Sequence, residues 1–229
     1  MADSIAKGRT QAKPGASLRA LRRQRGWTLA EVSERTGLPV PTLSRVENDK
    51  MALTFDKLVR ISEGLQVDIA ELIGSSGKKA PAAEGGTRRV VTRAGEGKAI
   101  ETEQGNYLYV ASELRNKKIV PIIGEVLAKN ASEYPEFMQH PGEEYLYVLE
   151  GTLELHTEVY TPVRLEKGDS VYFDSGMPHA YVAVGDKPCR VLSMCATPEA
   201  HLIGSLERLA EVKAASSVDL RKKRRVRKA

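Results

Sequence analysis

The sequence has few cysteines and aromatic residues and no long apolar run. Its 229 residues include two cysteines, Cys189 and Cys195. On one strand they would lie roughly 20 Å apart, at about 3.3 Å per residue, which is too far for a disulfide bond. No run approaches the roughly 20 apolar residues of a membrane span, and residues 1–15 lack the apolar core of a secretory signal. These absences exclude disulfide scaffolds and membrane proteins, and we expect a cytoplasmic protein.

The net charge of +5 is divided into three blocks. Residues 1–93 carry a net charge of +7, residues 94–220 carry −9, and residues 221–229 carry +7. The two basic blocks favour polyanionic partners such as nucleic acid. The last block is interpreted either as a solvated, disordered run or as an arm that adds phosphate contacts. The acidic middle block, which DNA would repel, is interpreted as a ligand-sensing or dimerising body.

Residues 17–73 predict five short helices. Ser17 can cap the first helix. Thr28 and Glu31 form a Thr-x-x-Glu capping box for the second, which ends at Gly37. A third helix follows after this short turn, as in a helix-turn-helix. Apolar residues at three- and four-residue spacing predict the fourth helix after Thr54.

The composition changes after the helices. Residues 1–16 are predicted to be a disordered arm, and residues 74–93, rich in Gly, Ser and Lys, a flexible linker. Residues 94–200 predict an all-β domain, and residues 201–229 a closing helix with the basic tail. Short β-type runs without intervening helices favour a sandwich or barrel. These runs are RVVT, KAIETE, YLYVA, IVPIIGEVLA, EYLYVLE, TLELHT, SVYF, HAYVAV and CRVLSM.

The string LRRQRGWTLAEVSERTGLPVPTLSRVENDK resembles the DNA-binding domain of Xre-family transcription regulators. This resemblance implies that the helix after Gly37 reads the major groove of an operator. Glu47 is expected to be structural and to pair with Arg22. Thr28 and Asn48 are expected to contact phosphates. The predicted groove-facing residues are Val40, Pro41, Thr42, Ser44 and Arg45.

Two later segments, FMQHPGEEYLYVLEGTLELH and GDSVYFDSGMPHAYVA, resemble the two motifs of the cupin superfamily, a double-stranded β-barrel. His140, Glu144 and Gly151 keep the spacing of the first motif, and His179 belongs to the second. Met138 stands where the first histidine of the full motif would be.

The resemblance implies a possible metal site. Two histidines and one carboxylate, His140, Glu144 and His179, form a facial triad that suits Fe(II) and also accepts Zn(II), Mn(II) or Ni(II). The alternative is that these residues are retained as scaffold and that the barrel binds an organic effector without metal. The predicted ligand pocket consists of Met138, Tyr181, Tyr107 and Tyr109.

Strand alternation predicts an apolar outer face on residues 143–150. If Glu144 points inward, then Tyr145, Tyr147 and Leu149 point outward. Such a face predicts a covered surface, most simply in a homodimer or a higher even oligomer.

Two functions follow from these observations. The first is a sequence-specific DNA-binding transcription regulator whose cupin domain dimerises and senses a small-molecule effector, and which is not an enzyme. The alternative is a mononuclear non-haem iron cupin enzyme, which resembles a phosphonate epoxidase in its layout.

Overall fold

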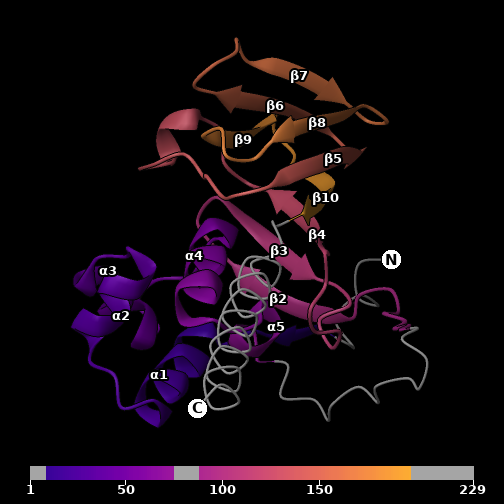
Figure 1. Cartoon of the computed structure of the whole chain (residues 1–229). Coiled ribbons are helices and arrows are strands. Elements are labelled where there is room, and N and C mark those ends of the chain that lie inside the picture. The colour runs from indigo at the N-terminus through magenta and orange to yellow at the C-terminus, as the bar shows by residue number, and fades with distance from the viewer. Residues whose placement is uncertain (1–8, 75–87, 197–229) are drawn as a thin grey trace, which may run out of the picture. The chain divides into compact units, whose positions relative to one another are not determined.

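The computed structural model describes residues 9–74 and 88–196, and Figure 1 shows their helices and strands. The chain divides into two compact units, residues 1–196 and 197–229. The second unit lies outside the described residues, and so does the greater part of the predicted linker. The predicted helix and basic tail at 201–229 are therefore not tested.

Five α-helices follow one another in the N-terminal part of the described chain. None of the described helices is long and apolar enough to cross a membrane. The predicted all-α N-terminal domain is confirmed. Its elements are α1 (Pro14–Gln24), α2 (Leu29–Thr36), α3 (Val40–Glu47), α4 (Phe55–Leu65) and α5 (Ile69–Leu72).

The N-terminal boundary predicted at residue 17 is wrong. α1 begins at Pro14, whose fixed φ suits the first helical turn and whose missing N–H costs nothing there. Arg9–Gln11 form strand β1, so residues 9–16 are not a disordered arm. The sequence signal for β1 is weak because the strand is only one short segment of polar residues.

The helix-turn-helix connection is built as the sequence predicts. The Thr28 side chain accepts a hydrogen bond from the backbone N–H of Glu31, and the Glu31 carboxylate accepts one from the N–H of Thr28 at 2.7 Å. Gly37 ends α2 with a φ of 66°, a left-handed conformation that glycine adopts without steric cost. α3 then starts at Val40.

A partly buried ion pair joins α1 to α3. Arg22 Nε donates to Glu47 Oε1 at 2.7 Å, and Arg22 Nη2 donates to Glu47 Oε2 at 2.8 Å. The hydrogen bond to Glu47 raises the pKa of Arg22. Arg22 also donates to the backbone carbonyl of Trp27 at 3.0 Å. The predicted structural role of Glu47 is confirmed.

Two β-sheets and one short 3-10 helix, η2 (Ala131–Glu133), form the remaining regular structure of the described chain, as predicted for a double-stranded β-barrel. One sheet has the strand order β1-β2-β3-β4-β10-β5-β8, and the other has the order β7-β6-β9. The strands are β2 (Gly97–Glu101), β3 (Gly105–Tyr109), β4 (Ile119–Val126), β5 (Glu143–Glu150), β6 (Thr152–Thr157), β7 (Val163–Glu166), β8 (Ser170–Asp174), β9 (His179–Val184) and β10 (Cys189–Ala196).

Two details of the strand prediction are wrong. The run RVVT at residues 89–92 forms no strand, and β7 is absent from the predicted strands. Three of the four residues of β7 are exposed, so it lacks an alternating apolar pattern. Strand alternation in β5 is as predicted: Glu144, Leu146 and Val148 are buried.

The helical domain and the barrel share a hydrophobic core. Leu18, Leu43 and Leu58 of the helices belong to the same buried cluster as Tyr109 and Ile122 of the sheet. Polar contacts reinforce this interface. The Asp68 carboxylate accepts a hydrogen bond from the N–H of Asn116, and Arg115 forms an ion pair with Glu71 at 2.8 Å.

Candidate functional site

The predicted groove-facing residues lie on α3. Val40, Pro41 and Arg45 are exposed, whereas Thr42 and Ser44 are half-buried. Within the described residues, no hydrogen bond or ion pair engages the guanidinium of Arg45. An exposed, unpaired guanidinium on this helix can donate two parallel hydrogen bonds to a guanine or a phosphate.

Two predicted phosphate contacts, Thr28 and Asn48, are exposed at helix ends but already make local hydrogen bonds. The Thr28 hydroxyl donates to the Glu31 carboxylate at 2.8 Å. The Asn48 side chain donates to the carbonyl of Ser44 at 2.7 Å. Their role toward DNA stays a prediction.

Trp27 packs rather than presenting a free face for base stacking. It is half-buried against the helical core. The guanidinium groups of Arg25 and Arg35 lie 4.9 and 4.4 Å from the centroid of the Trp27 ring. These cation–π contacts hold two positively charged guanidinium groups beside the Trp27 ring, next to the start of α2.

The barrel encloses a cavity of about 30 Å³. An ordinary organic ligand site measures roughly 300–1,000 Å³, whereas one water molecule needs a cavity of about 10–15 Å³. The space in this conformation therefore suits an ion or one or two water molecules. It is lined by Thr54, Phe55, Tyr107, Ile122, Gly124, Val126, Met138, His140, Glu144, His179, Tyr181, Val191, Ser193 and Cys195.

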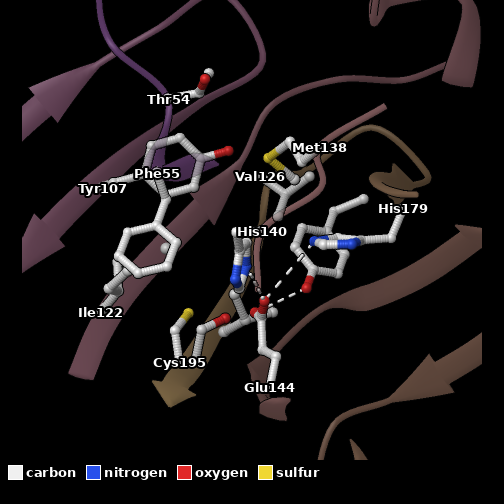
Figure 2. A pocket seen from close by; sticks show the side chains of 14 residues that line it. Thr54, Phe55, Tyr107, Ile122, Val126, Met138, His140, Glu144, His179 and Cys195 are labelled. Carbon is white, nitrogen blue, oxygen red and sulfur yellow. Dashed lines mark hydrogen bonds and ion pairs between the residues drawn. The ribbon is translucent and has the colours of Figure 1, made fainter. Parts of the chain in front are cut away.

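The three predicted metal ligands come together in this cavity (Figure 2). The distance from His140 Nε2 to Glu144 Oε2 is 3.3 Å, and the distance from His179 Nε2 to Glu144 Oε2 is 3.8 Å. All three side chains are buried, with at most 4% of each exposed. Ligands of one metal ion lie about this far apart when each bond is about 2.0–2.2 Å long.

The hydrogen bonds of His179 leave a lone pair directed at the carboxylate. Its Nδ1 lies 2.9 Å from the carbonyl oxygen of Met177, which only accepts, so Nδ1 carries the proton. Burial lowers the pKa of His179, which favours the neutral ring. In the neutral ring Nε2 is an acceptor that lies 3.8 Å from Glu144 Oε2, and a cation fits between two such acceptors.

Glu144 is held as a carboxylate. Burial works to raise the pKa of Glu144, but the hydrogen bond to His140 and the proximity of His179 outweigh burial, and its pKa is lowered. The hydroxyl of Tyr181 donates to Glu144 Oε1 at 2.8 Å. Nδ1 of His140 is buried and has no hydrogen-bond partner. The donor set thus fits a divalent metal ion.

The four predicted pocket residues divide three to one. Met138, Tyr107 and Tyr181 line the cavity, whereas Tyr109 does not. Tyr109 is fully buried in the shared core, where its ring centroid lies 6.4 Å from that of Phe55. The prediction for Tyr109 is wrong because the neighbouring α4 fills the space beside it.

Three further residues contribute to the site without having been predicted. Cys195 lies directly opposite Glu144 in the pairing of β5 with β10. Thr54 and Phe55 come from the start of α4, and the Phe55 ring meets His140 edge-on at a centroid distance of 4.8 Å. Only the strand register and the docking of the helices place them here, and neither is visible as a motif.

Comparisons with known proteins agree with this division of the chain. A family described as "Helix-turn-helix" matches residues 18–72, and a family described as "Cupin domain" matches residues 125–195. A solved helix-turn-helix family transcriptional regulator from Vibrio cholerae is 18% identical, with a TM-score of 0.53, over 82% of this chain and 97% of that chain. At this identity the likeness concerns the fold.

Two enzymes also match parts of the chain. A dimethylsulfoniopropionate lyase, DddQ, from Ruegeria pomeroyi is 46% identical over 50 residues, which are 22% of this chain and a quarter of the length of the lyase. A hydroxypropylphosphonic acid epoxidase from S. wedmorenis is 21% identical over 81% of this chain and 97% of its own, with a TM-score of 0.43.

The chain thus combines an Xre-like helix-turn-helix domain with a cupin domain. This architecture supports a DNA-binding regulator.

Proposed function

We propose that this chain is a sequence-specific transcription regulator in which α3 reads an operator and the cupin cavity senses an effector. The unpaired guanidinium of Arg45, exposed on α3 of a helix-turn-helix domain, is the observation that supports DNA binding most directly. In this proposal four other residues of α3 also face the bases of the operator, namely Val40, Pro41, Thr42 and Ser44. Thr28 and Asn48 contact phosphates and so position the domain on the DNA. Selection of bound sequences from random duplex DNA, with and without metal, tests recognition and effector response together.

Replacing Arg45 by alanine is expected to weaken operator binding by about 1–3 kcal/mol if the guanidinium reads a base. The matched control is Arg190→Ala, which removes the same charge from an exposed position on the barrel. The measurement is titration of the selected operator and of a scrambled duplex. An equal loss on both duplexes would assign Arg45 to a phosphate instead.

We propose that His140, Glu144 and His179 hold the effector or a cofactor of the effector site, a divalent metal ion. When bound, the ion supplies a positive charge between three donors that otherwise face one another. The small cavity supports this choice over an organic effector, which would have to displace side chains to enter.

Phe55 provides the route from the cavity to the DNA-binding domain in this proposal. Its ring contacts His140, and it belongs to α4, the helix that packs against α2. A shift of the His140 ring on ligand binding would therefore be transmitted to the DNA-binding domain through packed side chains. The predicted linker is not needed as the path.

Phe55→Ala is expected to uncouple the two sites. In the parent protein we expect metal to change operator affinity by about 5–150-fold, the usual range of coupling between sites. In the variant this ratio should approach one, while metal binding persists. Phe137→Ala is the control, because Phe137 is also a half-buried aromatic residue but does not line the cavity. Full coupling in Phe55→Ala would contradict the proposed route.

We propose further that the outer face of the large sheet joins two copies of the chain. An outer apolar strip crosses β5, β10 and β4, and all of its side chains are half-buried. Tyr147 pairs with Leu192, which pairs with Ile123, and Tyr145 pairs with Met194, which pairs with Pro121. A two-fold dimer would cover this strip and present two α3 helices to an operator.

The second candidate function is a non-haem iron oxygenase, which the two-histidine, one-carboxylate donor set favours. In that proposal the ion keeps open coordination positions for substrate. Anaerobic loading with Fe(II), followed by assay of phosphonate oxidation, tests it. Turnover by the parent and none by Glu144→Gln would support the enzyme.

A further inference from the structure

The cavity contains a sulfur donor that the cupin motifs do not include. The ligand atoms of His140, Glu144 and Cys195 all lie within 4.8 Å of one another. Cys195 is 2% exposed, and Figure 2 shows it beside His140 and Glu144. It comes from β10, where antiparallel pairing sets it directly opposite Glu144.

We propose that Cys195 is a ligand of the metal ion, beside His140 and Glu144. This inference rests on the proposed metal site and specifies its chemistry. One imidazole, one carboxylate and one thiolate give the ion three protein donors of the kinds that Zn(II) takes. When the ion binds, the thiol loses its proton to solvent and the thiolate becomes the ligand.

The observations on this cavity favour a thiophilic ion such as Zn(II) over Fe(II) in a facial triad. Soft thiolate donors select Zn(II) or Cu(I), whereas a triad with open positions suits Fe(II). The unpartnered Nδ1 of His140 shows that this ring has unused bonding capacity. A cavity of about 30 Å³ leaves little room for a substrate beside an ion.

Cobalt(II) is the probe that tests Cys195, because it occupies zinc sites and reports its ligands by its spectrum. The full-length protein is stripped of metal with a chelator and titrated with Co(II). We expect visible bands of four-coordinate Co(II) and a near-ultraviolet thiolate-to-cobalt charge-transfer band, both removed by added Zn(II). Cys195→Ser should lose the charge-transfer band and bind Zn(II) at least about 10-fold more weakly, since even outer partners of ligands are worth 10–100-fold.

Cys189→Ser is the matched control, because Cys189 is buried on the same strand but does not line the cavity. It should keep the full spectrum. The inference is overturned if Cys195→Ser keeps the charge-transfer band, or if the parent binds Co(II) without one. It is also overturned if no protein binds Co(II), and in that case retained operator selection shows that the regulatory function stands without this metal site.

A measurement on the parent protein alone removes any dependence on the folding of the serine variant. Zinc X-ray absorption should show one sulfur at about 2.3 Å beside nitrogen and oxygen at about 2.0–2.2 Å. A shell of nitrogen and oxygen without sulfur would exclude Cys195 as a ligand.

Discussion

Glu47→Ala is expected to lower the free energy of unfolding by about 1–3 kcal/mol, because it leaves the partly buried guanidinium of Arg22 without its carboxylate partner. The side chains of Glu47 and Arg22 are only 4% and 17% exposed, so water replaces the lost hydrogen bonds poorly. The hydrogen bond to Glu47 raises the pKa of Arg22, so the guanidinium stays charged. Urea denaturation followed by circular dichroism measures the change.

The double variant Arg22→Met, Glu47→Leu is the control for this prediction. Replacing a buried pair by apolar residues of similar volume is often neutral or stabilising. We therefore expect the double variant to recover most of the stability that Glu47→Ala loses. A loss below about 1 kcal/mol in Glu47→Ala would show that the pair behaves as a solvent-screened surface contact.

Leu192→Asp is expected to convert a dimer into a monomer and to weaken binding to a two-fold symmetric operator by about 10²–10⁴-fold. An aspartate in the centre of the outer apolar strip would be desolvated without a partner in the interface. In a dimer, the second DNA-binding domain binds its half-site at a high effective concentration because it is joined to the first. A monomer lacks this advantage, which accounts for the size of the loss in operator affinity. Sedimentation velocity and operator titration measure the two effects.

Val163→Asp adds the same charge to an exposed apolar position on β7, in the other sheet, and should leave the dimer intact. Since Leu192 is half-buried, Leu192→Asp should keep the folded circular dichroism spectrum. A parent protein that sediments as a monomer, or a dimeric Leu192→Asp, would contradict the proposed interface.

The sequence predicts those features that depend on local patterns. The capping box at Thr28, the turn at Gly37 and the alternation around Glu144 each follow from a few neighbouring residues, and the structure has all three. The pairing of Glu47 with Arg22 was predicted from family resemblance, and it is present. Local patterns thus predict both domains, whereas the resemblance to the cupin motifs groups the three metal-ligand candidates.

The remaining features depend on contacts between distant segments. The register of β10 against β5 sets Cys195 opposite Glu144, and a shift by one residue would turn the thiol to the outer face. Phe55 has the spacing of an ordinary core residue on α4, and only the docking of that helix brings it to His140. The ring of Tyr109, on β3, packs against Phe55 of the same helix α4, and Tyr109 therefore does not line the cavity.

The short strand β1 has a consequence for how the DNA-binding helices are carried. Because β1 runs parallel to β2 and the N–H of Ala12 donates to the carbonyl of Ala99, the chain is fastened to the barrel sheet immediately before α1. At α5, the hydrogen bonds of Asp68 to Asn116 and of Glu71 to Arg115 fasten it again. A DNA-binding domain that is attached to the barrel at both of its ends cannot rotate freely relative to the barrel. We therefore expect a fixed distance between operator half-sites, so that inserting a few base pairs between them would be tolerated poorly.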